Sequence, residues 1–187
     1  MVSSITLKNL IIGYRSKHQL RAIASPVHAS LQAGELTCLI GANGVGKSTL
    51  LRTLAGFQPA LDGEILIQDK SLSDFSAQEL AREISIVLTS KTDHAQLSAE
   101  EIVGIGRSPY TGFWGTLSAA DKQIVASALQ ETGIQHLAQR NISELSDGER
   151  QKVMIAKALA QQTRIIILDE PTAFLDFPSK IETLQML

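Results

Sequence analysis

A glycine-rich segment that contains a lysine and two hydroxyl residues follows the apolar run 36–40. Glycines let successive backbone N–H groups point toward a polyphosphate, Lys47 supplies a mobile positive charge, and the Ser48 hydroxyl is a ligand suited to Mg²⁺. A helix that begins near Lys47 adds its positive dipole end. The pattern predicts a nucleotide-binding loop, and the alternative is a flexible glycine turn. The segment consists of Gly41, Ala42, Asn43, Gly44, Val45, Gly46, Lys47, Ser48 and Thr49.

An acidic pair, Asp169 and Glu170, follows a second apolar run at 165–168. In open α/β sheets, ligands bind at the carboxyl ends of strands. Asp169 can hold Mg²⁺ through a water molecule, and Glu170 can polarise the water that attacks a γ-phosphate. The alternative is a solvated acidic pair at the end of a strand.

Hydrophobic periodicity predicts the strands that must position these groups. Alternating apolar residues at 5–7 and 27–31 predict short antiparallel strands with one solvated face. The runs at 36–40 and 165–168 predict buried strands, and the second is apolar enough for burial on both faces. A further strand is predicted at 84–88.

Capping patterns predict where helices begin and end. Ser76 and Ser98 are each followed three residues later by a glutamate, which is the capping-box pattern at a helix start. An apolar stripe within 124–129 predicts a helix that ends at Gly133, and Gly56 is a C-terminal stop for the helix after the glycine-rich loop.

The segment 145–151, with the sequence LSDGERQ, resembles the signature Leu-Ser-Gly-Gly-Gln of the ATP-binding subunits of ABC transporters. Ser146 would begin a helix and offer its hydroxyl and free N–H groups to an anion. In the family this anion is the γ-phosphate of ATP held by the other subunit, and Gly148 belongs to the same contact. The alternative is that Ser146 and Glu149 form only a capping box. Asp147 replaces the first signature glycine, so its carboxylate must point away from the phosphate.

The resemblance covers nearly the whole chain and implies further site residues. Asp176 lies in the family's turn that helps to join two subunits, and Tyr14 occupies the place of an aromatic ring that stacks on adenine; the alternative for Tyr14 is packing. Thr89 stands where the family has a glutamine that contacts Mg²⁺. The chain ends at Leu187, before the family's switch histidine, so we expect a C-terminally truncated form.

The fold class implied by the resemblance is α/β, with a P-loop NTPase core. This core is RecA-like, with a mixed sheet and an antiparallel β subdomain, and it carries an inserted helical subdomain. We expect one incomplete ABC ATPase domain at 1–187, with the core and β subdomain at 1–94 and 161–187. The helical subdomain, which contains the signature, is expected at 95–160.

The implied function is that of an ATP-binding and ATP-hydrolysing subunit of an ABC transporter. ATP and Mg²⁺ are its expected cofactors, and Lys47, Ser146 and Glu170 are its expected catalytic residues. The expected partners are transmembrane permease subunits, a second copy in a homodimer and, indirectly, a substrate-binding protein, at the cytoplasmic face of the inner or plasma membrane. Two alternatives stay open: a non-catalytic nucleotide-binding fragment, and a soluble ABC ATPase outside transport.

The segments 106–115 and 117–121 resemble ATPases that drive uptake of iron–siderophore, haem or cobalamin complexes. Three aromatic residues lie at 110–114. They could form part of a surface that receives a permease helix, or a small aromatic core beneath the helical subdomain.

The composition and charge of the chain argue against several other classes of protein. The chain has 187 residues, of which 44 % are hydrophobic and 19 % charged, as in an ordinary globular domain. Its formal net charge of −2 gives no basic footprint, so we expect no nucleic-acid partner. Its apolar runs are far shorter than the roughly 18 residues of a membrane helix, and no secretory signal is visible. The single cysteine, Cys38, excludes an internal disulfide, fits a reducing compartment and is expected to pack within the strand at 36–40.

Overall fold

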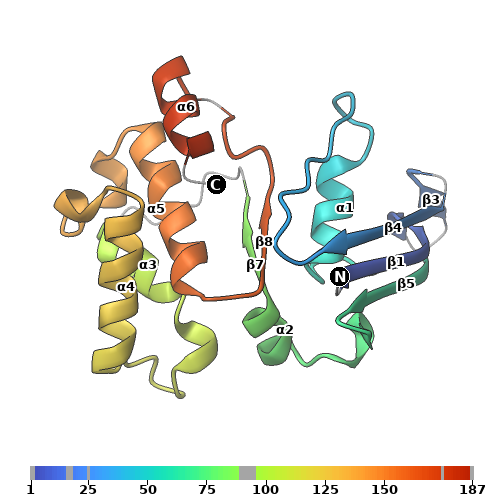
Figure 1. The fold of residues 1–187 in the computed structure, drawn as a ribbon, viewed down its shortest axis with the longest axis horizontal. Coiled ribbons are helices and arrows are strands. Elements are labelled where there is room, and N and C mark those ends of the chain that lie inside the picture. Colours follow the sequence, from blue (N-terminus) through green and yellow to red (C-terminus); the bar gives the residue numbers. More distant parts are fainter. Residues whose placement is uncertain (1–2, 16–18, 25, 89–95, 174, 186–187) are drawn as a thin grey trace. The chain divides into compact units, whose positions relative to one another are not determined.

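The chain folds as two compact units, Met1–Leu80 and Ala81–Leu187 (Figure 1). The computed structural model describes residues 3–15, 19–24, 26–88, 96–173 and 175–185. No helix in these described ranges has both the length and the apolar character needed to cross a membrane.

A four-stranded antiparallel sheet in the order β4-β1-β5-β6 forms the first unit's main layer. Its strands are β1 (Ser3–Ile11), β4 (Val27–Gln32), β5 (Asp62–Ile67) and β6 (Lys70–Ser71). Ile5 lies opposite Leu31 in this sheet, and Ile5 and Leu7 are both buried. The prediction that both alternating segments form antiparallel strands is therefore confirmed, and the structure shows that they pair with each other.

A short hairpin and a helix complete the first unit around the glycine-rich loop. The hairpin consists of β2 (Gly13–Arg15) and β3 (Leu20–Ala22). Helix α1 spans Lys47–Leu54 and so begins at the predicted residue. Gly56, with φ +74°, follows the end of α1, which confirms the predicted stop.

The predicted buried strand at 36–40 is wrong. These residues form no strand, and 74 % of Leu36 and 91 % of Ile40 are exposed. Cys38, which was expected to pack within this strand, is exposed as well. A parallel strand needs a neighbour that accepts its hydrogen bonds, and the sheets described within Met1–Leu80 are both antiparallel. The apolar composition of residues 36–40 was therefore not enough to predict that they are buried.

In the second unit, β7 (Ile84–Val87) and β8 (Ile165–Leu168) form a parallel pair. This confirms both predicted strands. The prediction that β8 is buried on both faces is wrong, because Ile167 is buried whereas Ile166 is 42 % exposed. The described sheet of this unit has two strands, and Ile84, Ser85 and Val87 of β7 are buried.

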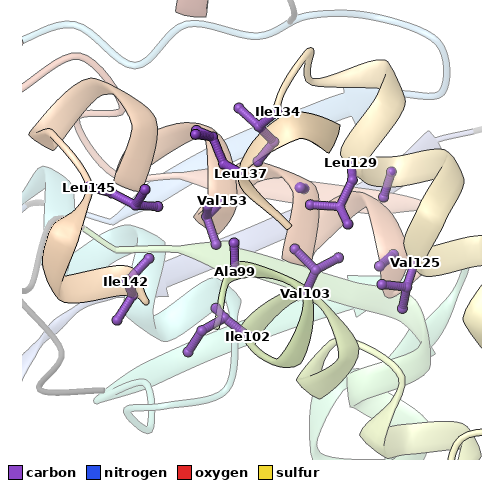
Figure 2. Packing of buried hydrophobic residues seen from close by; sticks show 13 residues of the cluster. Ala99, Ile102, Val103, Val125, Leu129, Ile134, Leu137, Ile142, Leu145 and Val153 are labelled. Atoms are coloured by element: carbon purple, nitrogen blue, oxygen red, sulfur yellow. The ribbon is translucent and has the colours of Figure 1, made fainter. Parts of the chain in front are cut away.

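Three helices of the second unit lie side by side (Figure 1). They are α3 (Ala99–Ile105), α4 (Ala119–Glu131) and α5 (Asp147–Ala160). Figure 2 shows their apolar side chains pointing toward one another in a cluster of buried residues that all lie between 99 and 160. A Cβ on Gly106 would lie 2.3 Å from the carbonyl oxygen of Lys157, so the end of α3 meets α5 where no side chain fits.

The starts of α3 and α5 are both closed by the predicted capping boxes. Helix α2 (Ala77–Glu83) begins with the same pattern, because Ser76 and Glu79 exchange two hydrogen bonds. Helix α6 spans Phe177–Gln185. The short 3-10 turns are η1 (Leu72–Asp74), η2 (Ser108–Tyr110), η3 (Gln135–Leu137) and η4 (Ile142–Glu144).

Candidate nucleotide-binding site

The glycine-rich loop reaches α1 through two residues with left-handed backbone. Gly44 has φ +80° and Gly46 has φ +107°. Gly46 is also the N-cap of α1, and a Cβ there would lie 2.5 Å from Cγ2 of Ile23. Both the backbone angle and the lack of space therefore require glycine at position 46.

The Lys47 ammonium folds back onto the loop. Its Nζ donates to the carbonyl oxygens of Gly41 at 2.8 Å and Ala42 at 3.0 Å. These acceptors are neutral, whereas a phosphate oxygen carries a negative charge and attracts the ammonium more strongly. A phosphate can therefore replace the carbonyls as the partner of Lys47.

Tyr14 contacts the helix that follows this loop. Its side chain is 52 % exposed, and its hydroxyl lies 3.1 Å from Oγ1 of buried Thr49 in the first turn of α1. Within the first unit, the structure thus brings together the predicted base-stacking ring and the predicted phosphate loop. Lys47, Ser48 and Thr49 form the first turn of α1, and the positive end of a helix dipole attracts an anion to such a turn.

The acidic pair follows β8 as predicted. Asp169 is buried, and its backbone N–H donates to the carbonyl of Val87 at 2.9 Å. Glu170 is exposed and has φ +48°, a left-handed conformation that costs a residue other than glycine about 1–3 kcal/mol. Gln68, Asp69 and Gln162 have positive φ as well, so the role of Glu170 stays a prediction.

The predicted metal ligands are the hydroxyls of Ser48 and Thr89 and the carboxylate of Asp169. Ser48 lies in the first unit and Asp169 in the second. Thr89, the third predicted ligand, lies outside the described residues. Among the described residues, no group of three or more His, Cys, Asp or Glu side chains could hold a metal ion. The Ser48 hydroxyl and the Asp169 carboxylate are each hard oxygen ligands of the kind that Mg²⁺ accepts, and Mg²⁺ usually keeps several waters and takes other ligands from substrate phosphates.

Ser146 is the N-cap of α5 and forms the capping box that was predicted as an alternative role. Its Oγ accepts from the N–H of Glu149 at 3.3 Å, while Oε2 of Glu149 accepts from the N–H and the hydroxyl of Ser146, each at 2.8 Å. The hydrogen bond from the Ser146 backbone is the main reason that the pKa of Glu149 lies below its ordinary value. The capping role does not exclude a phosphate contact, because the hydroxyl can redirect its hydrogen.

The carboxylate that replaces the signature glycine is paired within its own helix. Oδ1 of Asp147 accepts from Nη1 of Arg150 at 2.9 Å, and Nη2 of Arg150 donates to the carbonyl of Leu145. Arg150 thus offsets the negative charge of Asp147. A Cβ on Gly148 would lie 2.8 Å from Oγ of Ser179 in α6, so this signature glycine allows α6 to approach α5.

Asp176 caps the last helix, a role that the sequence interpretation missed. Its Oδ1 accepts from the N–H of Ser179 at 3.3 Å, and hydrogen bonding with Ser179 holds the pKa of Asp176 below its ordinary value. The signal was present in the sequence, since an aspartate before Phe177 and Pro178 is typical of a helix start.

The aromatic residues at 110–114 divide into two groups. The ring of Tyr110 lies under Arg107, with Cζ 4.1 Å from the ring centroid. Phe113 is 96 % exposed and Trp114 is 86 % exposed, and their rings meet edge to face at 5.4 Å. The predicted aromatic core is therefore wrong for Phe113 and Trp114, which form an exposed pair.

Sequence reasoning also missed a buried ion pair beside Tyr110. Nε of Arg107 donates to Oδ1 of Asp121 at 2.9 Å, and its Nη1 donates to the carbonyl of Ala160 at 2.9 Å and to Gln162 at 3.1 Å. Hydrogen bonds from Ser118 and then from Arg107 lower the pKa of Asp121. Arg107 thus joins the start of α4 to the end of α5.

Comparison with known proteins gives a consistent result. Residues 24–173 match the family described as ABC transporter. The chain is 39 % identical to an uncharacterized ABC transporter ATP-binding protein of Methanocaldococcus jannaschii, over 96 % of this chain and 61 % of that protein. It is 37 % identical to the iron(3+)-hydroxamate import ATP-binding protein of Bacillus subtilis, over 100 % of this chain and 68 % of that protein. The chain thus spans about two thirds of the length of these relatives.

A solved structure with a similar fold is a dimeric ATP-binding cassette in a post-hydrolysis state with ADP and phosphate bound. The TM-score is 0.82 at 26 % sequence identity, over 97 % of this chain and 80 % of that chain. This similarity confirms the predicted P-loop NTPase fold class.

Proposed function

This chain belongs to the ABC transporter family, and we propose that it is the ATP-binding subunit that hydrolyses ATP to drive transport through a separate membrane permease. The observation that carries the proposal is the geometry of the loop before α1. Gly46 permits the turn into the helix, and the Lys47 ammonium donates a hydrogen bond to a carbonyl of the loop. The Tyr14 hydroxyl contacts Thr49 in the first turn of the helix. A loop with this geometry, next to an open aromatic ring, suits a nucleoside triphosphate.

Nucleotide binding begins with Lys47. Its ammonium exchanges the carbonyls of Gly41 and Ala42 for β- and γ-phosphate oxygens, which are charged and therefore stronger acceptors. The N–H groups and the dipole at the start of α1 add favourable interactions with the same anion. Ser48 would be a ligand of Mg²⁺, which supplies neutralisation of phosphate charge when it is bound.

Hydrolysis in this proposal depends mainly on positioning and charge neutralisation. Glu170 orients the attacking water or accepts its proton. In a homodimer, Ser146 of the second copy would redirect its hydroxyl hydrogen from Glu149 to the γ-phosphate, and Asp176 would lie in the turn between subunits. The pairing of Asp147 with Arg150 supports this contact, since it lowers the repulsion between the Asp147 carboxylate and phosphate.

Import of an iron complex is the transport process that we propose. It is supported by the relative whose name describes iron(3+)-hydroxamate import. The subunit would act at the cytoplasmic face of the membrane, together with permease subunits and, indirectly, a substrate-binding protein. Phe113 and Trp114 would form part of the surface that binds the permease, because exposed aromatic pairs are frequent centres of protein interfaces.

Calorimetry with Mg²⁺ and ATP, beside a phosphate-release assay, tests the nucleotide part of the proposal. Lys47→Ala should abolish binding because it removes the mobile cation of the loop, while Lys122→Ala, which removes an exposed lysine of α4, should bind like the unchanged chain. Glu170→Gln should retain binding and lose turnover, because an amide cannot act as a base. Wild-type affinity in Lys47→Ala would contradict the assignment of the site.

A further inference from the structure

The side chain of Tyr14 is anchored at one end. Its hydroxyl and Oγ1 of Thr49 lie 3.1 Å apart, and either oxygen can donate the hydrogen. Thr49 is 6 % exposed and sits in the first turn of α1, so the anchor is a buried group on a regular helix. The ring itself is open to a ligand, because about half of Tyr14 is exposed.

The backbone beside Tyr14 is fixed by different contacts. The side-chain amide of Gln58, which follows α1, donates to the carbonyl of Gly13. Ile23, just after β3, lies directly against Gly46, where a Cβ would be 2.5 Å from its Cγ2. These contacts hold the β2–β3 hairpin against the loop and α1, but they leave the direction of the Tyr14 ring unspecified. The hydroxyl contact with α1 is the observed interaction that specifies it.

We propose that Thr49 is a positioning residue for Tyr14, whose hydroxyl orders the ring for stacking on the base of a nucleoside triphosphate before that ligand binds. The inference rests on the proposed nucleotide-binding function and goes beyond it, because it assigns part of the affinity for the base to the contact between the two side chains. An ordered ring loses less side-chain entropy when the base stacks on it. A ligand that has phosphates but no base does not contact the ring, so the ordering of the Tyr14 ring does not change its affinity.

The size of the effect follows from the cost of immobilising one side chain at a binding site, which corresponds to about a two- to twelvefold change in affinity. Tyr14→Phe keeps the ring and removes only the hydroxyl. We therefore expect it to raise the Kd for ATP by about two- to twelvefold. The Kd for inorganic tripolyphosphate should stay unchanged, since this ligand has no base.

The experiment is a double-mutant cycle on the full chain, with Tyr14→Phe, Thr49→Val and the combined variant, each titrated with ATP by calorimetry. Thr49→Val removes the other hydroxyl and keeps the shape of the side chain. Each single change should weaken ATP binding, and the combined variant should bind no more weakly than the weaker single variant. Thr53→Val is the matched control, because it removes a buried hydroxyl of α1 that donates to the Thr49 carbonyl at 2.7 Å.

Three results would overturn the proposal. They are unchanged ATP affinity in Tyr14→Phe, effects that simply add in the combined variant, and an equal loss of tripolyphosphate affinity in Tyr14→Phe. Thermal unfolding shows whether Thr49→Val folds. If it does not fold, the proposal is tested by Tyr14→Phe alone, through its change in affinity for ATP compared with its change in affinity for tripolyphosphate. Failure of the unchanged chain to bind ATP would overturn the proposed function together with this inference, whereas the three results above overturn only the inference.

Discussion

Replacing Gly46 by alanine is expected to destabilise the first unit more than the same change at Gly44. Both glycines have left-handed backbone, with φ +107° and φ +80°. A Cβ at position 46 would lie 2.5 Å from Cγ2 of Ile23, whereas a Cβ at position 44 would meet nothing within 4 Å. Gly44→Ala therefore introduces backbone strain alone, and Gly46→Ala introduces the same strain together with a collision.

The two contributions have known sizes. A left-handed residue other than glycine costs about 1–2 kcal/mol, and forcing an extra carbon into a filled site adds about 1–3 kcal/mol. We expect Gly44→Ala to lower the free energy of unfolding by about 1–2 kcal/mol. Gly46→Ala should lower it by about 2–5 kcal/mol, the sum of the two contributions.

Urea denaturation followed by circular dichroism measures both changes. The combined variant Ile23→Ala/Gly46→Ala, compared with Ile23→Ala alone, isolates the collision, because the shorter side chain leaves room for the new Cβ. In that background the cost of Gly46→Ala should fall to about that of Gly44→Ala. Equal losses for the two glycines, or no recovery when Ile23 is shortened, would refute the reasoning.

Further predictions concern the signature, the exposed aromatic pair, the core and pH. Ser146→Arg should leave ATP affinity of the isolated subunit nearly intact and prevent nucleotide-dependent dimers in gel filtration; loss of binding by the monomer would contradict a contact across the dimer. Trp114→Ala should weaken permease binding by about 2 kcal/mol, as at an interface centre, without lowering the thermal midpoint; a lowered midpoint would favour a packing role. Leu129→Ala should cost about 2–5 kcal/mol in chemical denaturation because the side chain is buried, and a loss below 1 kcal/mol would show a site that collapses around the cavity. The lowered pKa of Glu149 means that its capping contribution is present above pH 4.5, the ordinary pKa of its carboxyl, and is lost as pH falls through the lowered value; thermal midpoints should therefore fall less steeply on acidification in Glu149→Gln, and identical pH profiles would contradict this.

The sequence was sufficient wherever the interacting residues are neighbours in the chain. The capping boxes that begin with Ser98 and Ser146 each join residues three positions apart, so their geometry follows from helix geometry itself. The same holds for the start of α1 at Lys47 and for the stop at Gly56. Alternation also predicted that the segments at 5–7 and 27–31 are strands with one face toward the core, but it did not specify that they pair with each other.

The burial of an apolar run could not be predicted from the sequence of the run itself. The run at 36–40 has the composition of a core strand, yet its residues are exposed in the described structure. The similar run at 165–168 forms a strand because β7 pairs with it. The difference between the two lies in the presence of a hydrogen-bonding partner, which composition does not specify.

Only the tertiary structure decided which distant side chains meet. Tyr14 and Thr49 are 35 positions apart, and Arg107 reaches both Asp121 and the carbonyl of Ala160, 14 and 53 positions away. The sequence thus determined the chemistry of the phosphate loop, since that chemistry depends on consecutive residues. The folded chain determined the orientation of the ring beside the loop and the partners of the buried Arg107 guanidinium, because these depend on distances between separate elements.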